Sequence, residues 1–458
     1  MMEIAGKRAL ILGVAREGVA LAEYLCARGA VVTVTDSADG DRLQARLDRV
    51  RDLHVRIAVG GDRPELVDEA DIVFVSPGVP ENNTVYMAAE RAGLPIESMT
   101  TLFFELCPGR IVGITGSSGK TTTTGLVGHV LQAAGRDVVV GGNIGEPMLD
   151  LLPRIFAETI VVLELSSFQL ALLRRSPHIA VVTNISPNHL DRHGTMEAYI
   201  AAKLHIVEHQ SGEDFAVLNA DDAEHETFAS ATRARARWFG MGVQDGATVC
   251  KDTVTVARAG SLDPVLPVAE IPLLGRHNVE NVMAAVVVAD ILGVAPGIMA
   301  AAIRTFRPAP HRLELVAERD GVRYIDDSIA TSPARAQVAL EAIDQPIVLI
   351  AGGRDKRLPW EAFARVVSRR VRVLLLIGEA APIIEEAVRC QTNAPGDAGS
   401  PCIVRCGSLG EAVAEAHRLA RPGEVVLLSP ACTSYDMFTD FEERGRMFAR
   451  AVEALDAA

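Results

Sequence analysis

The chain has 458 residues, of which 49% are hydrophobic and 23% are charged, which is typical of a folded enzyme with more than one domain. Its formal net charge of -14 opposes the phosphate backbone of nucleic acid, so nucleic acid is not an expected partner. The sequence has no apolar run long enough to span a bilayer and no leader pattern at its start, so we expect a cytoplasmic protein without a membrane span.

The first part of the chain predicts an α/β domain. Residues 8–36 contain two apolar runs, the glycine-bearing turn GVAREG and an amphipathic stretch, in the order strand, turn, helix, strand. Ala15 stands where the dinucleotide fingerprint has its middle glycine, so this signal alone is weak. A further apolar run at residues 71–75 leads into a turn with Gly78, at a strand end where open α/β sheets bind ligands.

The strongest motif is residues 115–122 (TGSSGKTT), which lie between an apolar run and a helical stretch. Glycines let backbone N–H groups converge on phosphate oxygens, and the start of the following helix adds its dipole. Lys120 can reach the outer phosphates, and the Thr121 hydroxyl can bind Mg²⁺. The general pattern has glycine at the position of Ile114, but the strand-to-helix setting favours a phosphate loop.

Two further apolar runs end in polar side chains. Glu164 follows residues 160–163, where the pattern predicts burial, and a buried carboxylate needs a partner such as a divalent cation. The run at residues 179–184 leads into the loop 184–193 (NISPNHLDRH). His189 in that loop could be a Mg²⁺ ligand or a general base, and both roles stay open.

Lysine is rare in this chain, because only five of its 45 basic residues are lysine. A surface cation can be lysine or arginine, whereas an amine able to lose its proton cannot be supplied by arginine. Lys203 lies on a predicted helix with apolar neighbours, where a surface cation is the simplest interpretation. Since such positions are otherwise arginine, each lysine invites a functional reason: Lys7, Lys120, Lys203, Lys251 and Lys356.

The last third of the chain predicts another α/β domain. Its apolar runs at residues 347–351, 371–377 and 425–429 are separated by stretches of helical length. We interpret the proline-rich segment 306–310 (FRPAP) as the linker before it. We therefore predict three α/β domains, with boundaries at residues 1–98, 99–306 and 307–458.

Taken in order, the motifs resemble those of the Mur ligase family over nearly the whole chain. The resemblance is closest to the branch that adds D-glutamate. It rests on residues 115–122, 164–170 (ELSSFQL), 188–192 (NHLDR), 201–203 (AAK), 277–281 (HNVEN), 311–312 (HR), 327–331 (DSIAT) and 429–432 (SPAC).

This resemblance implies a Rossmann-like UDP-binding first domain, a central ATPase domain with a phosphate loop and a parallel-rich sheet, and a Rossmann-like third domain. For the UDP-linked substrate it implies Ala15, Arg16, Asp36, Ser37, Gly78 and Asn143. For ATP it implies Gly116, Ser117, Ser118, Gly119, Lys120, Thr121, Thr122, Asn278, Asn281, Arg312 and Asp327. For glutamate it implies Thr331, Lys356, Ser434 and Phe441.

The resemblance also implies two Mg²⁺ ions, one held by Thr121 and Glu164 and the other by His189 and Lys203. Lys203 would carry a carbamate formed with CO₂, which turns a cation into an anionic oxygen ligand. The implied catalytic residues are Lys120, Glu164, His189 and Lys203.

The implied reaction is the ATP-dependent ligation of D-glutamate to UDP-N-acetylmuramoyl-L-alanine in peptidoglycan synthesis, by a monomer. The acceptor carboxylate attacks the γ-phosphate of ATP, and the glutamate amine then displaces phosphate from the acyl phosphate. Two features depart from the family pattern: Ile329 stands where many members have lysine, and Arg16 with Glu17 replaces smaller residues. Because Ile329 removes a cation near the glutamate site, the choice between D- and L-glutamate stays open.

Two other functions share some of these features. Another Mur-type ligase, or a folate polyglutamate ligase, would use the same ATP motifs with a different amino acid or acceptor. A phosphate-loop NTPase that acts as a conformational switch would leave Lys203, Lys356 and residues 429–432 without a role. ADP formation that needs both a UDP-sugar acceptor and an amino acid would separate these alternatives.

Overall fold

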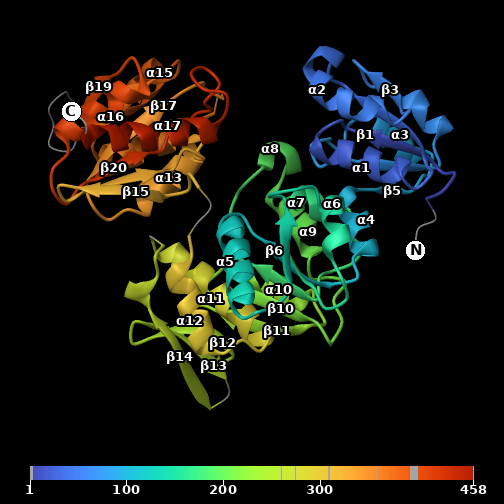
Figure 1. Cartoon of the computed structure of the whole chain (residues 1–458), viewed down its shortest axis with the longest axis horizontal. Helices are drawn as coiled ribbons and strands as arrows, with labels where there is room; N and C mark the ends of the chain where they lie inside the picture. The colour runs from blue at the N-terminus through green and yellow to red at the C-terminus, as the bar shows by residue number, and fades with distance from the viewer. Residues whose placement is uncertain are drawn as a thin grey trace. The chain divides into compact units, whose positions relative to one another are not determined.

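The structure is a computed structural model of the chain, and it describes residues 4–258, 260–273, 275–307, 310–356, 358–391 and 401–456. Three β-sheets follow one another along the chain, coloured from blue to red in Figure 1, and each is the centre of an α/β domain. The chain forms two compact units, Met1–Pro272 with Val279–Phe306, and Leu273–Asn278 with Arg307–Ala458. Three α/β domains are confirmed, and their predicted boundaries stay a prediction.

The first domain is built on a five-stranded parallel sheet. Its elements are β1 (Arg8–Leu12), α1 (Arg16–Cys26), β2 (Val31–Asp36), α2 (Gly40–Arg51), β3 (Arg56–Val59), a 3₁₀ helix (Pro64–Glu69), β4 (Ile72–Val75), α3 (Thr84–Arg91) and β5 (Ile96–Glu97). The strand order is β3-β2-β1-β4-β5. Because all strands are parallel, the turns after β1, β2 and β4 lie at one edge of the sheet, where such sheets bind ligands.

The central domain is built on a nine-stranded sheet. The elements from residue 99 to residue 306 are α4 (Met99–Leu106), β6 (Arg110–Thr115), α5 (Lys120–Ala133), β7 (Val138–Gly142), α6 (Met148–Leu151), a 3₁₀ helix (Leu152–Arg154), β8 (Ile160–Glu164), α7 (Ser167–Leu170), β9 (Ile179–Val182), α8 (Leu190–His193), α9 (Met196–Leu204), β10 (Phe215–Asn219), α10 (His225–Ser230), β11 (Arg235–Phe239), β12 (Gly246–Cys250), β13 (Thr253–Arg258), β14 (Ser261–Pro267), a 3₁₀ helix (Val268–Glu270), α11 (Arg276–Ile291) and α12 (Pro296–Thr305). The strand order is β14-β13-β12-β11-β10-β9-β6-β8-β7, and the strands from β7 to β12 pair in parallel. The polar segments that follow β6, β8 and β9 therefore emerge at the same edge of the sheet.

The antiparallel end of the central sheet goes beyond what the sequence analysis predicts. β13 pairs with both β12 and β14 in antiparallel fashion. Lys251 and Asp252 connect β12 to β13, and both have a positive φ, 47° and 57°. Two consecutive positive φ values are the backbone of the tight turn that matches the twist of a hairpin. Lys251 thus has a place in a turn, and no chemical role is needed to explain it.

The third domain is built on a six-stranded sheet with a core on each face. Its elements are β15 (Glu314–Arg319), β16 (Val322–Asp326), α13 (Pro333–Glu341), β17 (Ile347–Gly352), α14 (Glu361–Arg370), β18 (Val371–Ile377), α15 (Ala381–Arg389), β19 (Cys402–Arg405), α16 (Leu409–Leu419), β20 (Val425–Leu428), α17 (Phe441–Glu453) and a 3₁₀ helix (Ala454–Asp456). The strand order is β15-β16-β20-β17-β18-β19, with β15 antiparallel to β16. Leu349 belongs to one buried cluster and Ile350 to the other, as expected for a strand that is covered on both faces.

Two other expectations from the sequence concern the linker and the membrane. Pro308 and Ala309 of the predicted linker lie outside the described residues, so the linker stays a prediction. Across the described ranges, the helices are either too short or too polar to cross a membrane.

Candidate active site

The predicted phosphate loop lies between β6 and α5, as its sequence indicates. Gly116 has a φ of +148°, and a Cβ atom added there would come within 1.9 Å of the Thr183 hydroxyl oxygen. Gly119, with a φ of +78°, immediately precedes α5. The backbone N–H of Ser117 donates to the carbonyl oxygen of Asn184 at 2.8 Å. The glycines therefore let the loop lie against the end of β9 and present the N-terminus of α5, a setting that binds phosphate.

Two lysine side chains converge on one carbonyl group of this loop. Lys120 Nζ donates to the carbonyl oxygens of Gly116 and Ser117 at 2.8 and 3.2 Å. Lys203 Nζ donates to the same oxygen of Gly116 and to Thr115 Oγ1, both at 3.0 Å. Lys203 is only 1% exposed, and this burial, together with the charge of Lys120, lowers its pKa well below the usual value. These two causes shift the pKa of Lys203 toward a neutral amine, while the charge of Glu164 acts in the opposite direction.

Tyr199 is a site residue that the sequence analysis does not single out. Its hydroxyl oxygen lies 2.9 Å from Ser117 Oγ, and its ring centroid lies 4.9 Å from Lys203 Nζ. Ser117 Oγ donates to the carbonyl oxygen of Ser186 at 2.8 Å, so the Tyr199 hydroxyl is the donor in their hydrogen bond. A spacing of four residues places Tyr199 and Lys203 on one face of α9, and that spacing is the signal in the sequence.

Glu164 is a buried carboxylate at the end of β8, 3% exposed. Thr121 Oγ1 donates to its Oε2 at 2.7 Å, and Asn143 Nδ2 donates to its Oε1 at 2.9 Å. Both donors, a hydroxyl and an amide, are neutral, so these two hydrogen bonds do not neutralise the charge of the carboxylate. A Mg²⁺ ion fits this group of oxygen atoms, because it prefers oxygen ligands and would compensate the buried charge. Asn143, predicted to bind the acceptor substrate, lies beside the same carboxylate.

His189 is exposed and immediately precedes α8, with a φ of 55°. Its ring packs edge-on against Phe168, with centroids 5.3 Å apart. Phe168 stacks on His193 at 4.8 Å, and His193 contacts the ring of Tyr199 at 5.3 Å. These contacts connect His189 to the helix that carries Lys203. A shared Mg²⁺ between His189 and Lys203 stays a prediction.

Two asparagines predicted to bind ATP lie in α11, and both are buried. Asn281 Oδ1 accepts a hydrogen bond from Thr123 Oγ1 at 3.2 Å. A Cβ atom added at Gly119 would come within 2.3 Å of the same Asn281 oxygen. Asn281 therefore touches both the phosphate loop and α5. Thr122, another predicted ATP residue, is buried in the same helix. The backbone N–H of Asn278 donates to the carbonyl oxygen of Gly275 at 3.0 Å.

The residues predicted to bind UDP in the first domain lie after β1, β2 and β4, at one edge of the sheet. Asp36 accepts hydrogen bonds from the backbone N–H groups of Val14 and Ala38, at 2.8 and 2.9 Å. The carboxylate thereby ties the turn after β1 to the turn after β2. Four of the predicted residues are exposed at this edge: Ala15, Arg16, Ser37 and Gly78.

Arg16 and Glu17, which depart from the family pattern, both contact the central domain. Arg16 Nη1 donates to the carbonyl oxygen of Gly145 at 2.5 Å. Gln169 Nε2 donates to Glu17 Oε1 at 2.9 Å, and burial raises the pKa of the Glu17 carboxyl. Arg16 is thus engaged in a protein contact, and its role in UDP binding stays a prediction.

The predicted glutamate site has a different character. Lys356 is exposed, and its Nζ donates to Thr331 Oγ1 at 3.2 Å. Ser434 is buried. Phe441 begins α17, and its carbonyl oxygen accepts a hydrogen bond from Ser328 Oγ at 2.7 Å. The structure therefore brings Lys356 and Thr331 together, while the roles of Ser434 and Phe441 stay predictions.

Asp327, predicted to bind ATP, has a buried carboxyl group and lies immediately after β16. Ser429 Oγ donates to its Oδ2 at 2.8 Å, and the backbone N–H of Leu313 donates to its Oδ1 at 3.3 Å. Burial raises the pKa of Asp327 to about 7, although the Ser429 hydrogen bond and the charge of Arg312 act in the opposite direction. Since Leu313 directly follows Arg312, the hydrogen bond from Leu313 places the two predicted ATP residues Arg312 and Asp327 near each other in this unit.

Arg444 is a second residue that the sequence analysis does not single out. Its guanidinium is buried and donates to both oxygens of Ser328, at 2.8 and 2.9 Å, and to the carbonyl oxygen of Cys432 at 3.1 Å. Burial lowers its pKa to about 10. The signal in the sequence is its place three residues after Phe441 and four before Phe448, where helical periodicity predicts an apolar side chain.

Three family models match consecutive parts of the chain. The model described as Mur ligase MurD-like, N-terminal domain, matches residues 7–98. The model described as Mur ligase middle domain matches residues 114–289, and the model described as Mur ligase, glutamate ligase domain, matches residues 311–432.

Curated relatives match over their full length. A UDP-N-acetylmuramoylalanine–D-glutamate ligase from Symbiobacterium thermophilum is 46% identical over 98% of both chains. A relative of the same name from a Roseiflexus species is 42% identical over 99% of this chain and 100% of its own. Among solved structures, a UDP-N-acetylmuramate–alanine ligase from Thermotoga maritima matches 98% of this chain and 100% of its own, with a TM-score of 0.57 and 19% identity, which shows the shared fold.

Proposed function

The chain belongs to the Mur ligase family, and from this premise we propose that it joins D-glutamate to UDP-N-acetylmuramoyl-L-alanine in peptidoglycan synthesis. The observation that carries the proposal is 46% identity over 98% of both chains to a relative named for this reaction. The family uses ATP and requires Mg²⁺. The expected ligase activity is therefore preferred to the NTPase switch, which would need neither acceptor nor amino acid.

The first step activates a carboxylate, which is a poor electrophile. The terminal carboxylate of the acceptor attacks the γ-phosphorus of ATP, the bond to the β-phosphate oxygen breaks, and an acyl phosphate and ADP result. The backbone of the phosphate loop would bind the phosphates, and Lys120, which the loop carbonyls already orient, would stabilise the charge that develops on them.

The second step forms the amide bond. The free amine of glutamate attacks the acyl carbon, phosphate leaves from the tetrahedral intermediate, and the nitrogen releases one proton as the amide forms. We propose that Lys356 binds a carboxylate of glutamate. Its side chain is exposed, and the hydrogen bond that it donates goes to a neutral hydroxyl, that of Thr331, so its charge is available for an anionic ligand. Thr331, Ser434 and Phe441 would complete this site.

For Mg²⁺ we propose Thr121 and Glu164 as ligands of one ion, and His189 and Lys203 as ligands of another. Bound Mg²⁺ would offset the negative charge of the transferring phosphoryl group. The fit rests on the buried Glu164 carboxylate, whose described hydrogen-bond donors are the hydroxyl of Thr121 and the amide of Asn143.

We further propose that Lys203 reacts with CO₂. The neutral amine attacks the carbon of CO₂, a nitrogen–carbon bond forms, and the amine proton is released, which leaves an anionic carbamate. Burial beside Lys120 favours the neutral amine that this step requires, whereas arginine stays protonated. The carbamate oxygens would then suit Mg²⁺ better than an ammonium group could.

The function is tested by measuring ADP release with UDP-N-acetylmuramoyl-L-alanine and one amino acid at a time: D-glutamate, L-glutamate, L-alanine, L-lysine or meso-diaminopimelate. We expect turnover with D-glutamate and none when the acceptor is omitted. Faster turnover with L-glutamate would overturn the stereochemistry and keep the ligase class. ADP release that needs neither substrate would favour the NTPase switch.

The acyl phosphate has its own test. With ¹⁸O in the L-alanine carboxylate, one labelled oxygen should leave in the inorganic phosphate. Unlabelled phosphate would contradict the activation step. We also infer that the enzyme works in the cytoplasm, where ATP is available, and as a monomer, which light scattering of the purified chain would check.

A further inference from the structure

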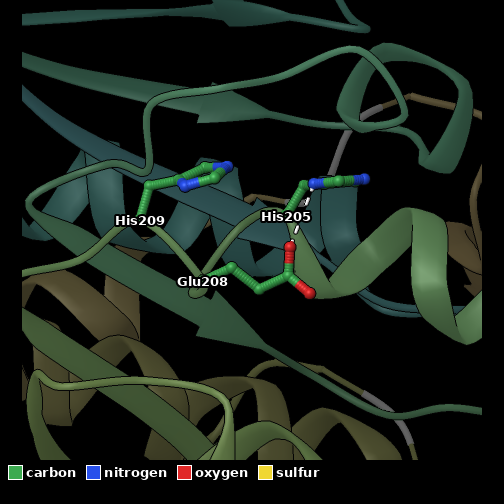
Figure 2. Close-up of side chains that lie close together, drawn as sticks. All are labelled: His205, Glu208 and His209. Carbon is green, nitrogen blue, oxygen red and sulfur yellow. Dashed lines mark ion pairs between the residues drawn. The ribbon is translucent and has the colours of Figure 1, made fainter.

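Three side chains with metal-binding atoms gather in the turn that follows α9. They are His205, Glu208 and His209, and Figure 2 shows them close to one another. His205 Nδ1 lies 3.1 Å from Glu208 Oε2, and the two imidazole centroids are 6.2 Å apart. One ligand atom from each residue lies within 4.8 Å of the other two. A single ion could therefore contact all three side chains.

The backbone of this turn is fixed on its inner side. Ile206 and Val207 are fully buried in the core, so the three polar residues around them face outward. Ser176 Oγ donates to the carbonyl oxygen of His205 at 2.9 Å and accepts from the backbone N–H of His209 at 3.0 Å. The same hydroxyl thus holds both histidines. The positions from which the ligands project are preorganised before any ion binds.

The side chains themselves leave a binding capacity unused. His205 Nδ1 is buried, yet among the residues that the structure describes it has no hydrogen-bond partner of good geometry, although Glu208 is near. The two side chains are 33% and 35% exposed, so an ion from solvent can reach them. A surface ion pair would explain His205 and Glu208 alone and would be worth little. Such an ion pair would not explain why a second imidazole ring, that of His209, lies beside these two side chains.

We propose that this cluster binds one divalent transition-metal ion of the zinc type, through two imidazole nitrogens and one carboxylate oxygen. Histidines four residues apart on a helical turn face the same side and can share an ion. Imidazole suits Zn²⁺, whereas Mg²⁺ prefers oxygen ligands and keeps its waters. Three protein ligands leave one position for water. The site is separate from the phosphate loop and from the oxygen ligands Thr121 and Glu164.

The position of the site suggests its effect. The turn continues α9, the helix that carries Lys203, and the backbone N–H of Glu208 donates to the carbonyl oxygen of Leu204 at 3.1 Å. Bound Zn²⁺ would fix the turn and, through Ser176, the segment before β9. Since the ion binds the folded chain in preference to the unfolded chain, it would raise the unfolding temperature.

The test is calorimetric titration of the whole chain with Zn²⁺, with Mg²⁺ in excess to fill oxygen sites. We expect one binding event that His209→Asn weakens at least about tenfold, because even loss of an indirect metal contact typically costs that much. The matched control is His54→Asn, which removes an exposed histidine elsewhere; its φ of 60° suits asparagine. Cys390 and Cys402 are exposed thiols, so any Zn²⁺ that they bind would be the same in the parent chain and in all variants.

A second readout keeps the proposal open to refutation if one variant folds poorly. The rise in unfolding temperature with Zn²⁺ should disappear in both His205→Asn and Glu208→Gln, and stay in His54→Asn. Equal Zn²⁺ affinity and an equal temperature rise in the parent chain and in all three cluster variants would overturn it. The ion would then bind elsewhere, for example at His311, Glu314 and Asp326, which also lie close together.

Discussion

Lys203 in the central domain and Lys356 in the third domain are the same residue in contrasting environments. Lys203 is 1% exposed, donates to Thr115 and Gly116, and shares the Gly116 carbonyl with Lys120. Lys356 is exposed and donates to the Thr331 hydroxyl. Desolvation is the main cause that lowers the pKa of each, but only the pKa of Lys203 falls well below the usual value.

The contrast shows how one side chain can serve two kinds of chemistry. A buried lysine beside a second cation gains from losing its proton, and a neutral amine can act as a nucleophile. An exposed lysine keeps its charge and can bind a carboxylate. In a chain that otherwise uses arginine, the first role requires lysine, and the second depends mainly on charge.

The largest expected effect is that of Lys203→Arg. Arginine keeps a positive charge but cannot form a carbamate. If the carbamate binds Mg²⁺, its loss removes several kcal/mol of transition-state stabilisation, and we expect turnover to fall about a thousandfold or more. Steady-state ADP release at saturating substrate measures this change.

The matched control is Lys251→Arg, because Lys251 lies in a hairpin turn and should tolerate arginine without loss of turnover. Lys203→Ala should be as inactive as Lys203→Arg, and acetate could partly restore it by occupying the vacated space. Near-normal turnover in Lys203→Arg would contradict the carbamate and show that Lys203, like Lys356, acts only through its charge.

The next effect is that of Lys356→Ala, which should raise the KM for D-glutamate. Loss of a hydrogen bond to a charged group costs about 1.5–3 kcal/mol, so a rise of about 10- to 100-fold is expected. Lys356→Arg should retain much of the affinity, since charge is what this site needs. Initial rates at varied D-glutamate check this, and equal losses in both variants would contradict the contrast with Lys203.

Asp327 tests the same principle with the opposite charge. Its folded pKa of about 7 is above the ordinary 3.8, so the protonated form stabilises the folded state, and this stability is lost as the pH rises through the folded value. Between pH 5 and pH 7 the loss is about 2 kcal/mol. Asp327→Asn should therefore lose less stability over this range than the parent chain. Urea unfolding without nucleotide at both pH values measures it, and parallel curves for the two proteins would refute it.

The smallest effect is expected for Ile329→Lys, which adds a cation near the proposed glutamate site. The backbone carbonyl of Ile329 accepts a hydrogen bond from the N–H of Thr331 at 2.8 Å. The new lysine would therefore project from a position next to Thr331, the residue to which Lys356 donates. A partly exposed cation contributes about 0.2–1 kcal/mol, so the KM for D-glutamate should fall about two- to fivefold. Ile329→Met is the uncharged control. A similar fall in both variants would show that charge is not the cause.

The sequence predicts the parts of the site whose geometry is local. Residues 115–122 specify their own turn, because Gly116 and Gly119 have a positive φ and leave no room for a Cβ atom. The burial of Glu164 follows from the apolar strand that it ends. Tyr199 and Arg444 act through contacts with Ser117 and Ser328, which lie 82 and 116 positions away, and helical spacing does not identify these partners. The hairpin of β12 and β13 depends on a positive φ at Lys251 and Asp252, and lysine has no strong preference for that turn conformation.

The hydrogen bond from Lys203 to Thr115 joins residues 88 positions apart. Closing so long a loop is slow compared with forming α9 itself, so during folding Lys203 first stands in water as an ordinary ammonium ion. On our proposal, CO₂ can react only after the central sheet has closed over the amine. The modification would then act as a maturation step: a chain arrested during folding would contain every residue of the phosphate loop and still be catalytically silent.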